Sequence, residues 1–159
     1  MTLTWMQAGI IIGAVAAAMA SGMSYVFSTG VMQALGQLPQ AEAVRAMQAI
    51  NVAVINPLFL GVFMGTGLFV AGLAGADVWH HAEAANPWLL GGTAVYLIGM
   101  VLVTIGGNVP LNDQLATLDP NALSADAWWA YARPWLAWNH LRTLAAAGAS
   151  TLFVLAALR

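Results

Sequence analysis

The sequence predicts an all-α fold: an integral membrane bundle of four transmembrane helices in a single domain, residues 1–159. Hydrophobic residues make up 61% of the chain and charged residues only 6%, and the mean hydropathy is +0.79. Soluble domains carry about 25% charged residues, so this chain has too few charges to cover a surface in water. We therefore expect much of its surface to face lipid.

Charged residues divide the chain into four apolar stretches, at 1–41, 46–76, 84–112 and 143–158. A helix that spans the bilayer needs about 20 predominantly apolar residues. The first three stretches exceed that length, and the fourth reaches it if its helix starts before Arg142. Because the stretches are continuous rather than alternating, they predict helices and exclude a β-barrel. We expect the helices to extend beyond the bilayer on one side, with both termini on the same side of a bacterial inner membrane.

Polar residues and prolines predict the connections between these helices. Residues 37–40 separate the first two helices, residues 77–87 link the second and third, and residues 119–121 end the third. Ser124 and Asp126 are suited to cap the last helix. Three prolines fall inside the helical runs and predict kinks: Pro57, Pro110 and Pro134.

The composition also excludes several classes of function. There is no cysteine, which excludes disulfides, thiolate nucleophiles and iron–sulfur clusters. Four Lys and Arg residues are too few for a basic patch that neutralises phosphates, so no nucleic acid partner is expected.

Polar side chains of all four helices are predicted to lie at one level of the membrane. Trp5, Trp79 and Trp88 mark one interface, as an aromatic belt does. About 20 residues of helix cross the roughly 30 Å hydrocarbon core. Counted from those residues and from Arg159, this length ends at polar residues of every helix: Tyr25, Asn51, Asn56, Asn108, Asn112, Asn139, His140 and Arg142. Such groups usually face the bundle interior and mark a site, although interfacial side chains or interhelical hydrogen bonds are the alternative.

Two patterns within this set suggest a chemistry. Asn108 and Asn112 stand at i and i+4, so both face the same way and could form a hydrogen-bonding wall for a carbonyl or an oxyanion. The last helix places an aromatic surface, an amide and a positive charge on one face, through Trp135, Trp138, Asn139 and Arg142. That face suits a flat aromatic ligand with an anionic oxygen.

His140 lies about 100° from Asn139 around the helix and could still border the same cavity. Its possible roles are a general base, a haem ligand, or a side chain that only bonds a backbone carbonyl.

Three segments give the chain a family resemblance: residues 25–32 with Leu35, residues 46–51 continuing through 56–59, and the pair 108–112 and 135–143. In these segments the sequence resembles the anthrone-oxygenase-like family of small membrane proteins. It departs from the family pattern at Gln33, where the family usually has proline. The resemblance implies a four-helix membrane fold and oxidation of polyketide anthrones to anthraquinones with O₂, without a metal or flavin.

The resulting hypothesis is an enzyme for a hydrophobic aromatic small molecule and O₂, with no cofactor. His140 would remove a proton from the substrate, while Arg142, Asn139, Asn108 and Asn112 stabilise the resulting oxyanion. The substrate would contact a second set of residues: Trp135, Trp138, Asn51, Asn56 and Tyr25. Two alternatives stay open, a haem-binding redox protein with His140 as the one axial ligand, and a non-catalytic module that binds a lipid or quinone.

Overall fold

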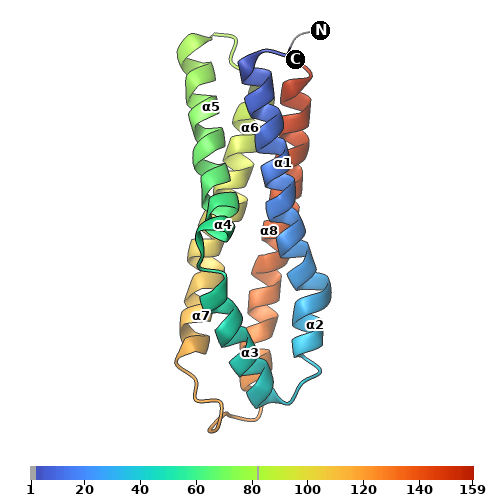
Figure 1. The fold of residues 1–159 in the computed structure, drawn as a ribbon, viewed down its shortest axis with the longest axis vertical. Helices are drawn as coiled ribbons and strands as arrows, with labels where there is room; N and C mark the ends of the chain where they lie inside the picture. Colours follow the sequence, from blue (N-terminus) through green and yellow to red (C-terminus); the bar gives the residue numbers. More distant parts are fainter. Residues whose placement is uncertain (1–2, 82) are drawn as a thin grey trace.

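The computed structural model describes residues 3–81 and 83–159 and confirms the predicted fold class (Figure 1). Four helical spans are long and apolar enough to cross a membrane: Trp5–Leu35, Pro57–His80, Pro87–Ala116 and Ala127–Ala157. The described part of the chain contains helices and no strand. The start of the first span and the end of the last lie at the same end of the elongated bundle (Figure 1).

The first and last helices, α1 (Trp5–Val26) and α8 (Ala127–Ala157), make the most extensive contact in the described bundle. Both helices bury small residues in the core: Ala17, Ala20, Ala146 and Ala149. Small side chains let helix backbones approach closely inside a membrane. Because the two backbones are close, the hydroxyl of Ser21 on α1 can donate a 3.0 Å hydrogen bond to the carbonyl of Thr143 on α8.

The second span begins at a helix break and not, as predicted, at a kink within one helix. Helix α3 (Gln40–Ala53) ends before Asn56, and a new helix, α4 (Pro57–Leu60), starts at Pro57. The Asn56 side chain caps α4 by accepting hydrogen bonds from the amides of Leu58 (3.1 Å) and Phe59 (3.0 Å). Proline has no amide hydrogen and is best placed in a first helical turn, so this Asn-Pro pair favours a new start over a kink.

Three of the four spans contain π-helical turns, which the sequence analysis did not predict. They are η1 (Phe27–Val31), which leads into α2 (Met32–Leu35), η2 (Gly61–Gly65), which leads into α5 (Thr66–His80), and η3 (Leu97–Leu102) with η4 (Thr104–Asn108), between α6 (Pro87–Tyr96) and α7 (Val109–Ala116). Pro110 lies just after the junction of η4 and α7, and Pro134 lies inside α8. π-helical turns are rare and frequently lie at functional sites.

The hydrophobic core has two parts. The part near the chain ends includes Ile10, Val70, Leu89, Tyr96 and Phe153. The part at the other end includes Met32, Val44, Leu115, Trp128 and Tyr131. The π-helical turns lie at or near the junction of the two parts along the chain, and two of them carry polar residues, Ser28 in η1 and Thr104 and Asn108 in η4.

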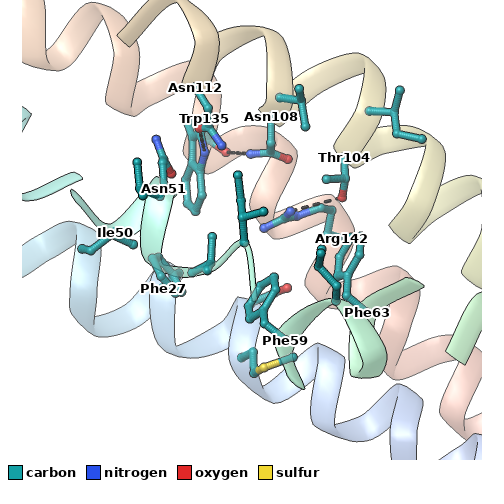
Figure 2. Close-up of a pocket in the computed structure, with 18 of the residues that line it drawn as sticks. Phe27, Ile50, Asn51, Phe59, Phe63, Thr104, Asn108, Asn112, Trp135 and Arg142 are labelled. Atoms are coloured by element: carbon teal, nitrogen blue, oxygen red, sulfur yellow. Dashed lines mark hydrogen bonds between the residues drawn. The ribbon is translucent and has the colours of Figure 1, made fainter. Parts of the chain in front are cut away.

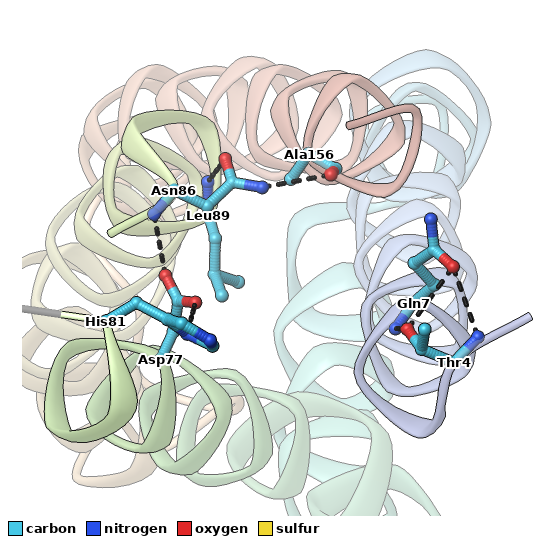
Figure 3. A network of polar contacts seen from close by, with 7 residues as sticks. All are labelled: Thr4, Gln7, Asp77, His81, Asn86, Leu89 and Ala156. Carbon is cyan, nitrogen blue, oxygen red and sulfur yellow. Dashed lines mark hydrogen bonds and ion pairs between the residues drawn. The ribbon is translucent and has the colours of Figure 1, made fainter. Parts of the chain in front are cut away.

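A polar network holds the end of the bundle that carries the chain ends (Figure 3). Asp77 accepts a 2.6 Å hydrogen bond from the amide of Asn86 and pairs with His81 at 3.2 Å. The Asn86 side chain caps α6 and donates to the carbonyl of Ala156 at 3.0 Å, so it ties α6 to α8. These contacts fix the loop between the second and third spans at the level of Trp79 and Trp88.

Candidate active site

A cavity of about 400 Å³ lies between the two parts of the core (Figure 2). Phe63 and Met100 belong to one part of the core and Met47 and Trp135 to the other, and all four line the cavity. All four spans and α3 contribute to its walls. Most of the lining is apolar, and the polar lining residues are Ser24, Gln48, Asn51, Thr104, Asn108, Asn112, Asp113 and Arg142. Its size and its few convergent polar groups are typical of small-molecule sites.

Arg142 is the positive charge of this cavity. Its guanidinium donates a 3.1 Å hydrogen bond to the hydroxyl of Thr104 and a second to the side-chain oxygen of Asn139. Its Cζ lies 5.6 Å from the ring centre of Trp135 and 5.9 Å from that of Phe63. Cation–π contacts of this kind contribute about 0.5–2 kcal/mol each.

No carboxylate among the described residues lies within ion-pair distance of Arg142. A charge at membrane depth is costly, and it is normally paired or functional. The hydroxyl, the amide and the two rings hold this guanidinium without neutralising it, so the cavity is suited to an anionic ligand.

Asn139 positions Arg142 and does not itself line the cavity. The side chain of Asn139 is completely buried, and its amide donates to the carbonyl of Ser24 at 2.7 Å and to the hydroxyl of Ser28 at 2.8 Å. These two bonds fix the amide so that its oxygen faces Arg142. The predicted role of Asn139 in the site is therefore supported only as a contact to Arg142.

Asn108 and Asn112 both line the cavity, in agreement with their predicted common face (Figure 2). Asn108 donates to the carbonyl of Trp135 at 3.1 Å. The side-chain oxygen of Asn112 accepts from the indole of Trp135 at 2.9 Å and from the hydroxyl of Tyr131 at 3.0 Å. The two amides thus orient Trp135, and the ring of Trp135 in turn packs against the Arg142 guanidinium.

Three buried polar atoms of the cavity lining have no hydrogen-bond partner in the described part of the protein. They are the amide nitrogen of Asn51, the side-chain oxygen of Asn108 and Nε of Arg142. A buried polar group without a partner costs about 1–3 kcal/mol, and such groups are rare in native proteins. These atoms have almost no accessible surface, so a ligand with an anionic oxygen and a hydroxyl would reach the two donors and the acceptor only after a small shift of the lining side chains.

Besides Asn139, four other predicted site residues do not line the cavity. His140 is exposed on the outer face of α8, because the 100° step from Asn139 turns it away from the bundle. Trp138 is also exposed and packs its ring against Gly107. Asn56 is engaged in the cap of α4, and Tyr25 is exposed on α1. The structure places His140 outside the cavity that it could have bordered, and the direct ligand contacts predicted for Trp138, Asn56 and Tyr25 have no support in this geometry.

The cavity also contains residues that the sequence analysis missed. Asp113, the residue after Asn112, lines the cavity. The sequence signal that could have identified it is that the third charge-free stretch ends at this carboxylate. Phe59 and Phe63 line it from the start of the second span (Figure 2). Nothing in the sequence distinguishes these two phenylalanines from ordinary lipid-facing or core residues.

A haem or metal centre has little support from the residues present. No histidine lines the cavity, and the described residues contain no group of three or more His, Cys, Asp or Glu side chains that could hold a metal ion. The haem alternative needed His140 inside the bundle, where the structure does not place it.

Comparison with known proteins gives one match. A family model described as anthrone oxygenase matches residues 49–152. The matched region includes Asn51, Asn108, Asn112, Trp135 and Arg142. No curated protein and no solved structure matches the chain.

Proposed function

Because this membrane protein belongs to the anthrone oxygenase family, we propose that it oxidises a flat, hydroxylated aryl ketone of the anthrone type with O₂. The observation that carries the proposal is the Arg142 guanidinium, held between two aromatic rings in an apolar cavity with no carboxylate partner among the described residues. The first step of anthrone oxidation forms an anion, and this cavity supplies the complementary charge.

The cavity lining matches such a substrate in shape and in hydrogen bonding. The rings of Phe27, Phe63 and Trp135 offer flat apolar walls to a tricyclic molecule. The unpartnered donors of Arg142 and Asn51 and the unpartnered acceptor of Asn108 belong to the cavity lining, where a small side-chain shift would let them bond an oxyanion and a phenolic hydroxyl of the substrate.

The reaction begins with loss of a proton from the methylene group between the two aryl rings. We assign this step to Asp113, the carboxylate that lines the cavity, since His140 lies outside it. The electron pair of the broken C–H bond delocalises onto the ketone oxygen, and Arg142 stabilises that charge. A low dielectric strengthens this stabilisation.

The carbanion then reduces O₂. A C–O bond forms to give a peroxide anion, which takes the proton held by Asp113 and becomes a hydroperoxide. Loss of the second proton from the same carbon, with cleavage of the O–O bond, forms a ketone and releases water. One CH₂ group and one O₂ thus give one C=O group and one H₂O.

The test is oxygen consumption by the protein in lipid nanodiscs with an anthrone as substrate. Arg142→Gln replaces the guanidinium with a neutral amide that can still donate hydrogen bonds, so it removes the charge, and we expect its kcat to fall by about 100-fold or more. Arg133→Gln is the matched control, because Arg133 also lies against a tryptophan, 5.9 Å from the Trp129 ring centre, but outside the cavity. We expect the control to retain full activity.

Two results would contradict the proposal in different ways. Equal activity in Arg142→Gln and the wild type would show that the guanidinium does not stabilise the reacting anion. Tight binding of an anthraquinone by a wild-type protein that consumes no O₂ would favour the non-catalytic binding module.

A further inference from the structure

The cavity has an exposed margin that is mostly apolar, with the exposed carboxylate of Asp113 beside it. Six of its lining residues are large apolar side chains that are also exposed on the surface: Val52, Ile55, Leu60, Met64, Ile105 and Val109. Their exposed fractions reach 74% at Val52, 72% at Ile55 and 54% at Ile105. The opposite walls are closed, because Met47, Met100 and Trp135 are buried.

The exposed residues form two edges of a lateral opening. One edge is the break between α3 and α4 with the turn that follows it, and the other is η4 with the start of α7. Helix α5 packs against α6 on one side of the opening, and α3 packs against α7 on the other, while α4 and η4 make few direct contacts. In Figure 1, α4 lies between α5 and α3 along the long axis of the bundle.

This opening lies at membrane depth. Leu60 and Met64 belong to the second span, and Ile105 and Val109 belong to the third. An exposed apolar side chain within a span faces lipid hydrocarbon. The part of the margin that belongs to the two spans therefore meets the bilayer, whereas Val52 and Ile55 lie just before the start of the second span.

We infer that the substrate is a lipophilic molecule dissolved in the membrane and that it reaches Arg142 sideways, between the α3–α4 break and η4. This inference rests on the proposed binding of an aromatic ligand in the same cavity. The apolar edges accept a flat ring system from lipid, and the polar groups at the inner wall then orient it. A substrate delivered in this way is selected first by its partition into lipid and only then by its oxygen atoms.

The experiment narrows the opening without touching the inner wall. Ile105→Trp and Val109→Trp place a large side chain at one edge, whereas Leu68→Trp adds the same side chain at an exposed position of α5 (76% exposed) that does not line the cavity. With an anthrone in the lipid of proteoliposomes, we expect the two edge variants to raise KM by about 10-fold with kcat largely kept, and Leu68→Trp to match the wild type.

A second measurement tests the same opening without relying on the folding of the tryptophan variants. The chain has no cysteine, so Ile105→Cys and Leu68→Cys each carry a single reactive thiol on an already folded protein. A bulky maleimide attached at position 105 should slow the association of anthraquinone, and the same label at position 68 should not. Quenching of tryptophan fluorescence measures the association rate.

Varying the lipid composition separates the two possible directions of access. Lipids that differ in their partition coefficient for anthrone change its mole fraction in the bilayer at one fixed aqueous concentration, and the rate should follow that mole fraction. A rate that follows the aqueous concentration, with unchanged KM in both edge variants, would overturn lateral access while leaving the proposed oxygenase intact. A wild-type protein that neither binds anthraquinone nor consumes O₂ would overturn both.

Discussion

At the scale of single residues, the site is organised around one cation and the amides that hold it. Arg142 is fixed by Thr104 and Asn139, and Asn139 is fixed in turn by Ser24 and Ser28. This chain of bonds connects η1 of the first span to the charge in the cavity. The guanidinium is therefore preorganised for an anion before any ligand arrives.

The base can be identified by comparing two substitutions. Asp113→Asn keeps the shape of the side chain and removes its ability to take a proton, so we expect kcat to fall by about 100-fold or more. His140→Ala changes an exposed side chain outside the cavity, and we expect kcat to stay within a factor of about two of the wild type. Oxygen consumption at saturating anthrone measures both. The reverse result, with His140→Ala inactive and Asp113→Asn active, would restore His140 as the base.

Asn139 should act on substrate binding through Arg142. Asn139→Ala removes the acceptor of one Arg142 bond and the side-chain donor to the Ser24 carbonyl and the Ser28 hydroxyl. We expect a loss of stability of about 1–3 kcal/mol and a rise in KM that exceeds the fall in kcat. Ser28→Ala removes only one neutral partner and should change both quantities much less. Thermal unfolding in detergent and steady-state kinetics of the two variants provide the comparison.

The sequence predicted this part of the site in outline. Asn51, Asn108, Asn112, Trp135 and Arg142 were expected in one cavity, and all five line it. Helical spacing gives the direction in which each side chain points from the helix axis. It does not say which of those directions are covered by a neighbouring helix. Trp138 lies at the edge of the predicted face and His140 beyond it, so both ended outside the cavity although they are neighbours of Asn139 in sequence.

At the scale of elements, the spans themselves followed from charge and hydropathy, whereas their irregularities did not. A stretch free of charge predicts a helix in lipid because the backbone has no other partners there. It does not reveal where the helix breaks or widens. The α3–α4 break depends on the cap formed by Asn56, and the π-helical turns depend on packing between helices that lie far apart in sequence.

The contact between the third span and α8 depends on a missing side chain at Gly99. A Cβ atom at Gly99 would overlap the side chain of Ala145 on α8. Gly106 lies in the same span, and a Cβ atom there would meet nothing within 4 Å. We therefore expect Gly99→Ala to destabilise the protein by about 1–3 kcal/mol and Gly106→Ala to be neutral or slightly stabilising. Equal thermal unfolding temperatures for the two variants would show that the third span shifts to accept the methyl group.

At the scale of the whole molecule, the cavity separates two hydrophobic cores and takes walls from all four spans. The two cores close the cavity along the bundle, and its exposed margin faces sideways at membrane depth. A polar site with lateral access to the bilayer is suited to substrates that a water-soluble enzyme could not keep in solution. The composition predicted the membrane location, but the position of the cavity required the packing of helices that no single stretch of sequence contains.

A ligand in this cavity should join the two cores and stabilise the molecule as a unit. An anthraquinone at about 100 times its Kd adds about 2.7 kcal/mol to the stability of a protein that binds it only when folded. We expect the thermal unfolding temperature of the wild type to rise with anthraquinone concentration. In Arg142→Gln the ligand loses its charged contact, so the rise should be much smaller at the same concentration, while Arg133→Gln should respond as the wild type does. A rise of equal size in all three proteins would mean that the ligand partitions onto the lipid-facing surface, because only a ligand in the cavity distinguishes Arg142 from Arg133.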